Sequence, residues 1–224
     1  MTRREKRNFF ISVEGEVCEK MYFEHLERLI KNSSRSKYIF SATIKSKQPY
    51  EFAKSLSYLP QETGKSAAPY MHINDIENYS NDEHRKKFNH LIDQIEKAKK
   101  TYGISYMLGY SNYTFEVWML LHRTEKCIKV SSRDQYLHLI NNAFGCSFRD
   151  ISEYKSKAVF EKVLKQITLD NVEEAIRRAE DIERANEGDA KSMRSHNGTT
   201  FYVSNPYTTV HQVVKKIFET CELQ

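Results

Sequence analysis

The stretch NFFISVEGE, residues 8–16, decides the interpretation of the fold. It opens with an apolar, β-favouring run and continues into an acidic turn at Glu14. A short apolar run of this kind is typical of a strand buried on both faces of a parallel sheet. From Glu16 to about Lys31 the apolar residues follow the helical period instead. Strand, acidic turn and helix in this order predict the first unit of a parallel α/β sheet.

The rest of the first half repeats this alternation. We predict three more strands and two more helices there, namely strands over residues 38–44, 69–73 and 104–108 and helices over residues 49–59 and 81–102. Each crossover is long enough for a right-handed βαβ connection. Residues 1–111 therefore predict a small parallel β-sheet flanked by helices.

The second half, residues 112–224, has a different pattern. Its apolar residues follow the helical period in five segments, at residues 114–122, 131–142, 155–166, 170–187 and 206–219. Asp170 and Glu173 form a capping-box pattern, and Asn205 or Thr208 is expected to cap the last helix. Residues 194–202 are polar and predict a loop. We expect a mostly helical elaboration packed on the core, in one continuous domain.

Composition excludes some classes of protein. The chain has 224 residues, 35 Lys and Arg against 30 Asp and Glu, and a formal net charge of +5, which permits nucleic-acid binding without requiring it. Its four cysteines form no CxxC pair, which disfavours structural zinc and a disulfide framework. No apolar run approaches the ~20 residues of a membrane helix or fits a secretory signal. We expect a cytoplasmic protein without a membrane partner.

Acidic residues follow two of the predicted strands. Glu14 follows the first, and Asp75 and Glu77 follow the third. If these strands are neighbours, the carboxylates meet in one crevice at the carboxyl ends of the sheet. Oxygen-only ligands suit Mg²⁺ or Mn²⁺, which can activate water for phosphodiester hydrolysis. The alternative is that these acids only stabilise the starts of the following helices.

Several blocks of the chain resemble the RloB family of prokaryotic defence proteins. They are VEGE at 13–16 followed by Glu19, Tyr22-Phe23 and Leu26, the pair Asp75 and Glu77, SNYTFEVWMLLH at 111–122, Tyr154-Lys155, EAIRRA at 174–179 and SNPYTTVH at 204–211. The acidic pattern is similar to that of Toprim domains, with glutamate in the second place of the Asp-x-Asp pair.

The resemblance implies a Toprim-like α/β core and a metal-dependent nuclease of phage defence or abortive infection. Glu14, Asp75 and Glu77 would then hold Mg²⁺ or Mn²⁺. The substrate would be DNA or RNA, with tRNA one candidate. An ATPase of the ABC or SMC-like type is the expected partner, and the sequence leaves a homodimer open.

Two further residues are candidates for the site. Glu116 lies in an apolar helix, where a charge must be paired or bound to metal. It is either an accessory acid of the site or a buried ion-pair partner. Lys155 is a candidate phosphate contact, or else part of a solvated lysine-rich face. For His122, which ends the same helix as Glu116, we favour a structural role over acid–base catalysis.

A basic stretch in the second half is a candidate nucleic-acid surface. Its residues are Arg177, Arg178, Lys191 and Arg194, which could contact a phosphate backbone. Ion pairs with Glu173 and Glu174 on the same helix explain the two arginines equally well.

The sequence thus supports a metal-dependent nuclease first. The alternative from another class is a noncatalytic regulatory or binding subunit that docks a partner ATPase. A Toprim-like nucleotidyl-transfer enzyme is disfavoured, because the chain has no zinc or template-binding motif.

Overall fold

The computed structural model describes residues 4–58, 68–125, 129–130 and 132–224. The predicted helix end at residue 59, the predicted helix start at residue 131 and Cys127 lie outside the described residues.

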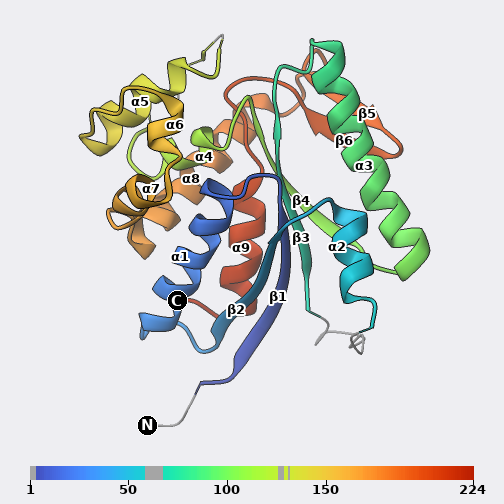
Figure 1. Ribbon diagram of the computed structural model, residues 1–224, viewed down its shortest axis with the longest axis horizontal. Helices are drawn as coiled ribbons and strands as arrows, with labels where there is room; N and C mark the ends of the chain where they lie inside the picture. Colours follow the sequence, from blue (N-terminus) through green and yellow to red (C-terminus); the bar gives the residue numbers. More distant parts are fainter. Residues whose placement is uncertain (1–3, 59–67, 126–128, 131) are drawn as a thin grey trace.

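Four parallel strands form the central sheet, in the order β2-β1-β3-β4. Their bounds are β1 (Lys6–Val13), β2 (Ile39–Ser46), β3 (Tyr70–Ile76) and β4 (Tyr106–Asn112). The helices that connect them are α1 (Cys18–Asn32), α2 (Pro49–Leu56) and α3 (Asp82–Tyr102). Helices α2 and α3 cover one face of the sheet, whereas α1 and α9 (Val210–Thr220) cover the other (Figure 1). The predicted α/β class is confirmed.

The apolar residues of β1 and the capping residues of α3 explain why these two elements form where they do. Phe9, Ile11 and Val13 of β1 are buried, as expected for a central strand of a parallel sheet. Asn81 caps α3 by accepting hydrogen bonds from the N–H groups of Glu83 and His84, and Gly103 ends this helix with φ of 68°.

The order of the strands creates a switch point. β1 pairs with β2 on one side and with β3 on the other, so the chain winds outward in opposite directions from these two central strands. Open α/β sheets bind ligands at such a point, in the crevice beyond the carboxyl ends of the strands. Glu14 and Asp75 belong to the two strands concerned.

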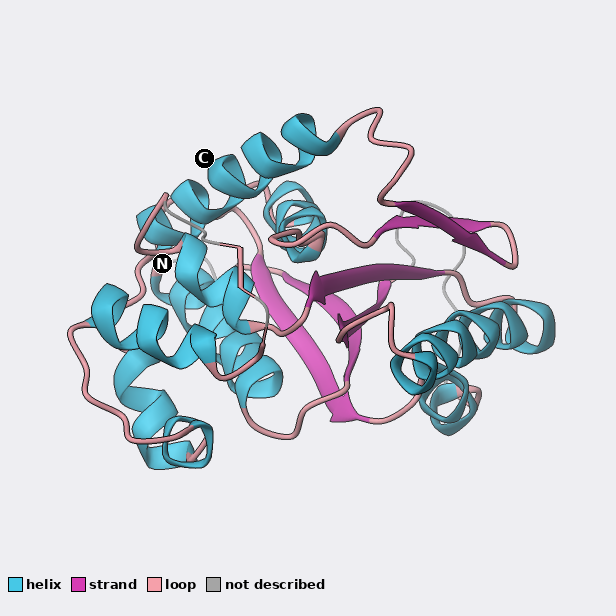
Figure 2. Cartoon of the chain, turned by 90° about the horizontal axis from the view of Figure 1, so that it is seen from above, coloured by secondary structure: helices cyan, strands magenta, loops and turns pink. Residues whose placement is uncertain are grey.

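The second half supplies most of the remaining helices. They are α4 (Glu116–Leu121), α5 (Gln135–Phe144), α6 (Ile151–Tyr154), α7 (Lys157–Leu164) and α8 (Leu169–Asn186). Buried residues of α4, α8 and α9 join those of α1 and β1 in one hydrophobic cluster. Figure 2 shows the central sheet from above, with helices packed on both of its faces.

Two local predictions in this half are wrong. Residues 194–202 do not form a loop but most of a hairpin, β5 (Met193–His196) and β6 (Thr199–Tyr202). Its turn is Asn197-Gly198, both with positive φ, which is the preferred pair for a tight hairpin. The capping box of α8 uses Thr168 and Asn171 rather than Asp170 and Glu173. Asp170 instead forms an ion pair with Arg35 at 2.9 Å.

The segment at 204–211 lies alongside β4. The N–H of Asn112 donates to the Tyr207 carbonyl at 2.9 Å, and the N–H of Thr209 donates to the Tyr110 carbonyl at 2.8 Å. Thr208 Oγ1 accepts from the N–H of Val210 at 3.2 Å, so of the two expected capping residues it is Thr208 that contacts the start of α9. This block is therefore part of the scaffold beside β4.

Candidate active site

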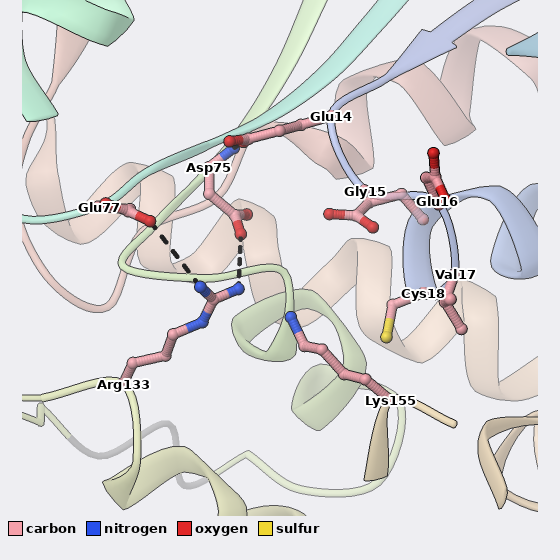
Figure 3. A pocket seen from close by; sticks show the side chains of 10 residues that line it. Glu14, Gly15, Glu16, Val17, Cys18, Asp75, Glu77, Arg133 and Lys155 are labelled. Atoms are coloured by element: carbon pink, nitrogen blue, oxygen red, sulfur yellow. Dashed lines mark hydrogen bonds and ion pairs between the residues drawn. The ribbon is translucent and has the colours of Figure 1, made fainter. Parts of the chain in front are cut away.

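A pocket of about 220 Å³ opens at the carboxyl ends of β1 and β3. We call it the acidic pocket, because five carboxylates and two basic side chains line it: Glu14, Glu16, Glu19, Asp75 and Glu77 with Arg133 and Lys155 (Figure 3). The three acids predicted from the strand ends are thus brought together, and so is Lys155. The expectation that the first and third strands are neighbours is confirmed.

The sheet itself fixes Glu14 and Asp75. β3 extends to Ile76, beyond the predicted end at Ile73, so that Asp75 still pairs with Ser111 of β4. The N–H of Asp75 donates to Glu14 Oε2 at 3.1 Å, and the N–H of Glu14 donates to the Ile73 carbonyl at 3.0 Å. The two acids therefore stand on rigid backbone at one edge.

Asp75 is a buried acid of the pocket whose charge is only partly compensated by Arg133. Its side chain is 7% exposed. Its Oδ1 atom is buried without a hydrogen-bond partner among the described residues. Burial raises the pKa of Asp75 well above its ordinary value, and the nearby carboxylates of Glu19 and Glu14 raise it further. A cation bound here would relieve both effects.

Glu19 is a member of the pocket that sequence reasoning did not assign to the site. It lies in the first turn of α1 and is 5% exposed. Burial raises its pKa to about 7. Its carboxylate lies so close to Gly15 that a Cβ atom there would collide with it. The signals in the sequence were therefore the place of Glu19 among the residues that resemble the family and the glycine of VEGE, whose missing side chain leaves room for this carboxylate.

Two basic residues that sequence reasoning missed contact the predicted acids. Arg133, just before α5, places Nη2 3.8 Å from Asp75 Oδ2 and Nη1 3.8 Å from Glu77 Oε1 (Figure 3). His84, on α3, places Nε2 2.6 Å from Glu77 Oε2. Its Nδ1 accepts from the N–H of Asn78 at 3.2 Å, so Nε2 carries the proton that Glu77 accepts. No sequence spacing relates these residues to the acids.

Glu116 and Lys155 form a pair beside the pocket. Glu116 is fully buried, accepts a hydrogen bond from Thr114 Oγ1 and lies 3.5 Å from Lys155 Nζ. Burial opposes the charged form of Lys155, but the combined attraction of Glu116 and other nearby acidic groups outweighs it and raises the lysine pKa. Lys155 lines the acidic pocket and Glu116 does not. Glu116 thus acts on the pocket through Lys155, whose charge and position it holds.

His122 has a structural environment. Its Nδ1 donates to the Trp118 carbonyl at 2.9 Å, and its Nε2 accepts from the Tyr22 hydroxyl at 3.1 Å. Burial lowers its pKa to about 3, so the ring is neutral at physiological pH. These contacts favour the structural interpretation of this residue.

The basic stretch lies apart from the acidic pocket. None of its four residues lines that pocket. On α8, Arg177 has ion pairs with Glu125, Glu174 and Asp181 at 3.0–3.2 Å. Arg178 donates to the Leu121 carbonyl at 2.7 Å, at the end of α4. Lys191 and Arg194 are exposed near the β5–β6 hairpin.

A second pocket of about 310 Å³ adjoins the acidic pocket. It shares Glu14, Asp75 and Glu77 with the acidic pocket, and its lining also includes Lys87 and His90 of α3. The three carboxylates therefore line both pockets, each of which also carries basic side chains.

The acidic pocket offers oxygen donors of the kind that Mg²⁺ and Mn²⁺ prefer. Within the described ranges, no three or more His, Cys, Asp or Glu side chains are already gathered tightly enough to hold a metal ion. Arg133 lies between Asp75 and Glu77 instead, and His84 holds Glu77 from the other side. The donor set and the unpartnered Asp75 Oδ1 nevertheless fit a hard cation.

The model of a family described as RloB-like protein matches residues 9–217, which include every block on which the resemblance was based. No curated protein and no solved structure matches the chain. Within the described part of the chain, no helix is long and apolar enough to cross a membrane.

Proposed function

The chain belongs to the RloB-like family, and we propose that it is a metal-dependent phosphodiesterase that cleaves DNA or RNA. One observation carries the proposal. Asp75, a buried carboxylate with an unpartnered oxygen, lies beside Glu14 at the switch point of a parallel sheet. A buried carboxylate oxygen without a hydrogen-bond partner is costly and is typical of a site that awaits a ligand.

The residues of the acidic pocket would have two roles in phosphodiester cleavage, metal binding and stabilisation of the phosphate. Glu14, Asp75 and Glu77 would hold Mg²⁺ or Mn²⁺, and Glu19 lines the same pocket. When bound, such a metal supplies an activated water and neutralises charge on a phosphate oxygen. Lys155, kept charged by Glu116, directs its ammonium group into the same pocket, where it would stabilise negative charge that develops on the phosphate.

The shape of the site favours a polymeric substrate. Two adjoining pockets share the three carboxylates, so a chain that passes over these acids would occupy both. Lys155 and Arg133 of the first pocket and Lys87 of the second would then contact different phosphates of that chain. An isolated phosphate ester would use only one pocket. DNA and RNA, including tRNA, both meet this requirement.

Family membership also supports a cellular role. We infer that the protein acts in phage defence or abortive infection in the cytoplasm, together with an ATPase of the ABC or SMC-like type. Such a partner would keep a nuclease that is toxic to its host inactive until infection.

The contacts that Asp75 and Glu77 make within the protein favour a second function. Arg133 and His84 already contact Asp75 and Glu77, as expected if the acids serve the structure alone. The chain would then be a noncatalytic regulatory or binding subunit of a defence complex.

A cleavage assay separates the two functions. Purified protein is incubated with Mn²⁺ or Mg²⁺ and with plasmid, single-stranded DNA or total tRNA, with and without the partner ATPase. We expect cleavage that EDTA abolishes and that Glu14→Gln and Asp75→Asn each lower by about 100-fold or more. Their thermal stability should be unchanged or higher, because each substitution removes repulsion between carboxylates.

The matched control is Asp82→Asn, the same change at an exposed position of α3. It should cleave like the wild type. If Glu14→Gln and Asp75→Asn also cleave like the wild type, this site assignment is wrong. If the wild type cleaves nothing even with its partner, the noncatalytic function is supported.

A further inference from the structure

Arg133 has an unusual position for an arginine. Its guanidinium group lies between Asp75 and Glu77, at 3.8 Å from an oxygen of each (Figure 3). Both distances exceed the 2.7–3.2 Å range typical of N–H···O hydrogen bonds. Arg133 is therefore attracted to the acids but is not locked to them by a bidentate hydrogen-bonded pair.

Charge rather than hydrogen bonding keeps the group there. The Nε atom of Arg133 is buried without a hydrogen-bond partner among the described residues. Burial opposes its charge, but the attraction of Asp75, Glu116 and Glu77 outweighs burial and raises the arginine pKa. The side chain is 40% exposed, so the guanidinium group also reaches the open part of the pocket.

We propose that Arg133 is the counter-ion of Asp75 and Glu77 while no metal is bound, and that it binds a substrate phosphate once a divalent cation takes its place. The inference rests on the proposed phosphodiesterase function and assigns that site a further residue in contact with substrate. A cation on the two carboxylates would remove the attraction that holds the arginine. The planar guanidinium fork, freed in the same pocket, matches two oxygens of a phosphate.

Asn205 links two residues that lie on either side of Arg133 in the sequence. Asn205 Nδ2 donates to the Val130 carbonyl at 2.7 Å, and the Tyr136 hydroxyl donates to Asn205 Oδ1 at 2.7 Å. Neither contact involves the side chain of Arg133, which can therefore change its partner. Asn205 is thus a positioning residue for Arg133, which gives the SNPYTTVH block a link to the acidic pocket.

The test measures the affinities for Mn²⁺ and for an oligonucleotide, which we expect to change in opposite directions in Arg133→Gln. Mn²⁺ is titrated calorimetrically into the wild type and Arg133→Gln without nucleic acid. Binding of a labelled single-stranded oligonucleotide is then measured with Ca²⁺ present, so that the strand stays intact. We expect Arg133→Gln to bind Mn²⁺ more tightly and the oligonucleotide about tenfold more weakly, the effect of losing one charge-assisted contact.

Three further variants test whether both effects depend on the guanidinium group at position 133. Arg149→Gln, the same change at an exposed arginine of the α5–α6 connection, should alter neither affinity. Arg133→Lys keeps the charge without the fork and should bind Mn²⁺ like the wild type but the oligonucleotide more weakly. Asn205→Ala should weaken oligonucleotide binding to a smaller extent, because it leaves the arginine in place but loosens its backbone.

The outcomes separate this inference from the proposed function. Cleavage by the wild type together with Mn²⁺ binding that is unchanged or weaker in Arg133→Gln would overturn the inference alone. Tighter Mn²⁺ binding and weaker oligonucleotide binding in that variant, without cleavage by the wild type, would support the inference and overturn the phosphodiesterase. A wild type that does not bind Mn²⁺ would overturn both.

Discussion

The acidic pocket and the basic face of α8, formed by Arg177, Arg178 and Arg184, are both dense in charge but differ in how that charge is compensated. On α8 each arginine has a carboxylate partner on the same helix. In the acidic pocket five carboxylates face two basic side chains, and Asp75 Oδ1 has no hydrogen-bond partner among the described residues. Charge density alone therefore does not locate a site, whereas buried charge without compensation does.

The difference has an energetic basis. Exposed ion pairs such as those of Arg177 contribute about 0–1 kcal/mol, so they form readily on any solvated helix. Burying carboxylates beside one another is expensive and persists only where the fold or a ligand compensates for it. The two regions should respond differently to the loss of a single charge.

The largest effect on stability should come from breaking the buried pair beside the acidic pocket. Lys155→Met leaves Glu116 charged, buried and unpaired, which should lower the free energy of unfolding by about 3–5 kcal/mol. Urea denaturation measures this change. The double variant Lys155→Met, Glu116→Gln should regain most of the loss. A single variant as stable as the wild type would show that the pair is unimportant.

An intermediate effect should appear in the pH dependence of stability without metal. The pKa of Glu19 rises from 4.5 to about 7 on folding, so the folded state binds a proton that the unfolded state has released. The free energy of unfolding should therefore fall as pH rises from about 4.5 to about 7, by up to about 3 kcal/mol. Asp75 should contribute in the same direction.

The matching variant is Glu19→Gln, which should flatten this pH profile. Glu24→Gln changes a partly exposed glutamate on the same helix and should leave the profile as it is in the wild type. A wild-type profile that is flat or rises over this interval would contradict the account of the acidic pocket.

The smallest effect should come from the basic face of α8. Arg177→Gln removes only exposed pairs and should change the free energy of unfolding by less than about 1 kcal/mol. Oligonucleotide affinity should stay within about twofold of the wild type, because the arginine is already neutralised. A larger loss with a shallower salt dependence would instead support the prediction that this stretch contacts nucleic acid.

The sequence was informative where one segment determines its own structure. The alternation of apolar runs and helical periods predicted the α/β class, and the blocks carried the family resemblance that the family match confirms. The capping box was misplaced because Thr168 and Asp170 both suit the start of a helix. The hairpin was missed because β5 is mostly exposed and neither short strand gives an alternating apolar pattern.

The site was predictable only in part, for the same reason. Glu14 and Asp75 follow apolar runs, so their place at a strand end could be predicted. Arg133 and His84 approach from a connection before α5 and from α3, and no local pattern reveals a partner that only tertiary packing brings near. Glu19 was part of the family resemblance and suited the first turn of a helix, but no local pattern indicated that its carboxylate turns back toward Gly15 into the pocket.

The central claim is that the carboxylates of the acidic pocket hold a divalent cation. Calorimetric titration of Mn²⁺ into the purified wild type, beside Asp75→Asn and the exposed control Asp82→Asn, tests it most directly. We predict that the wild type and Asp82→Asn bind Mn²⁺ alike and that Asp75→Asn binds it at least about tenfold more weakly, the loss expected for one charged ligand. Equal binding by all three proteins, or no binding by the wild type, would contradict the account.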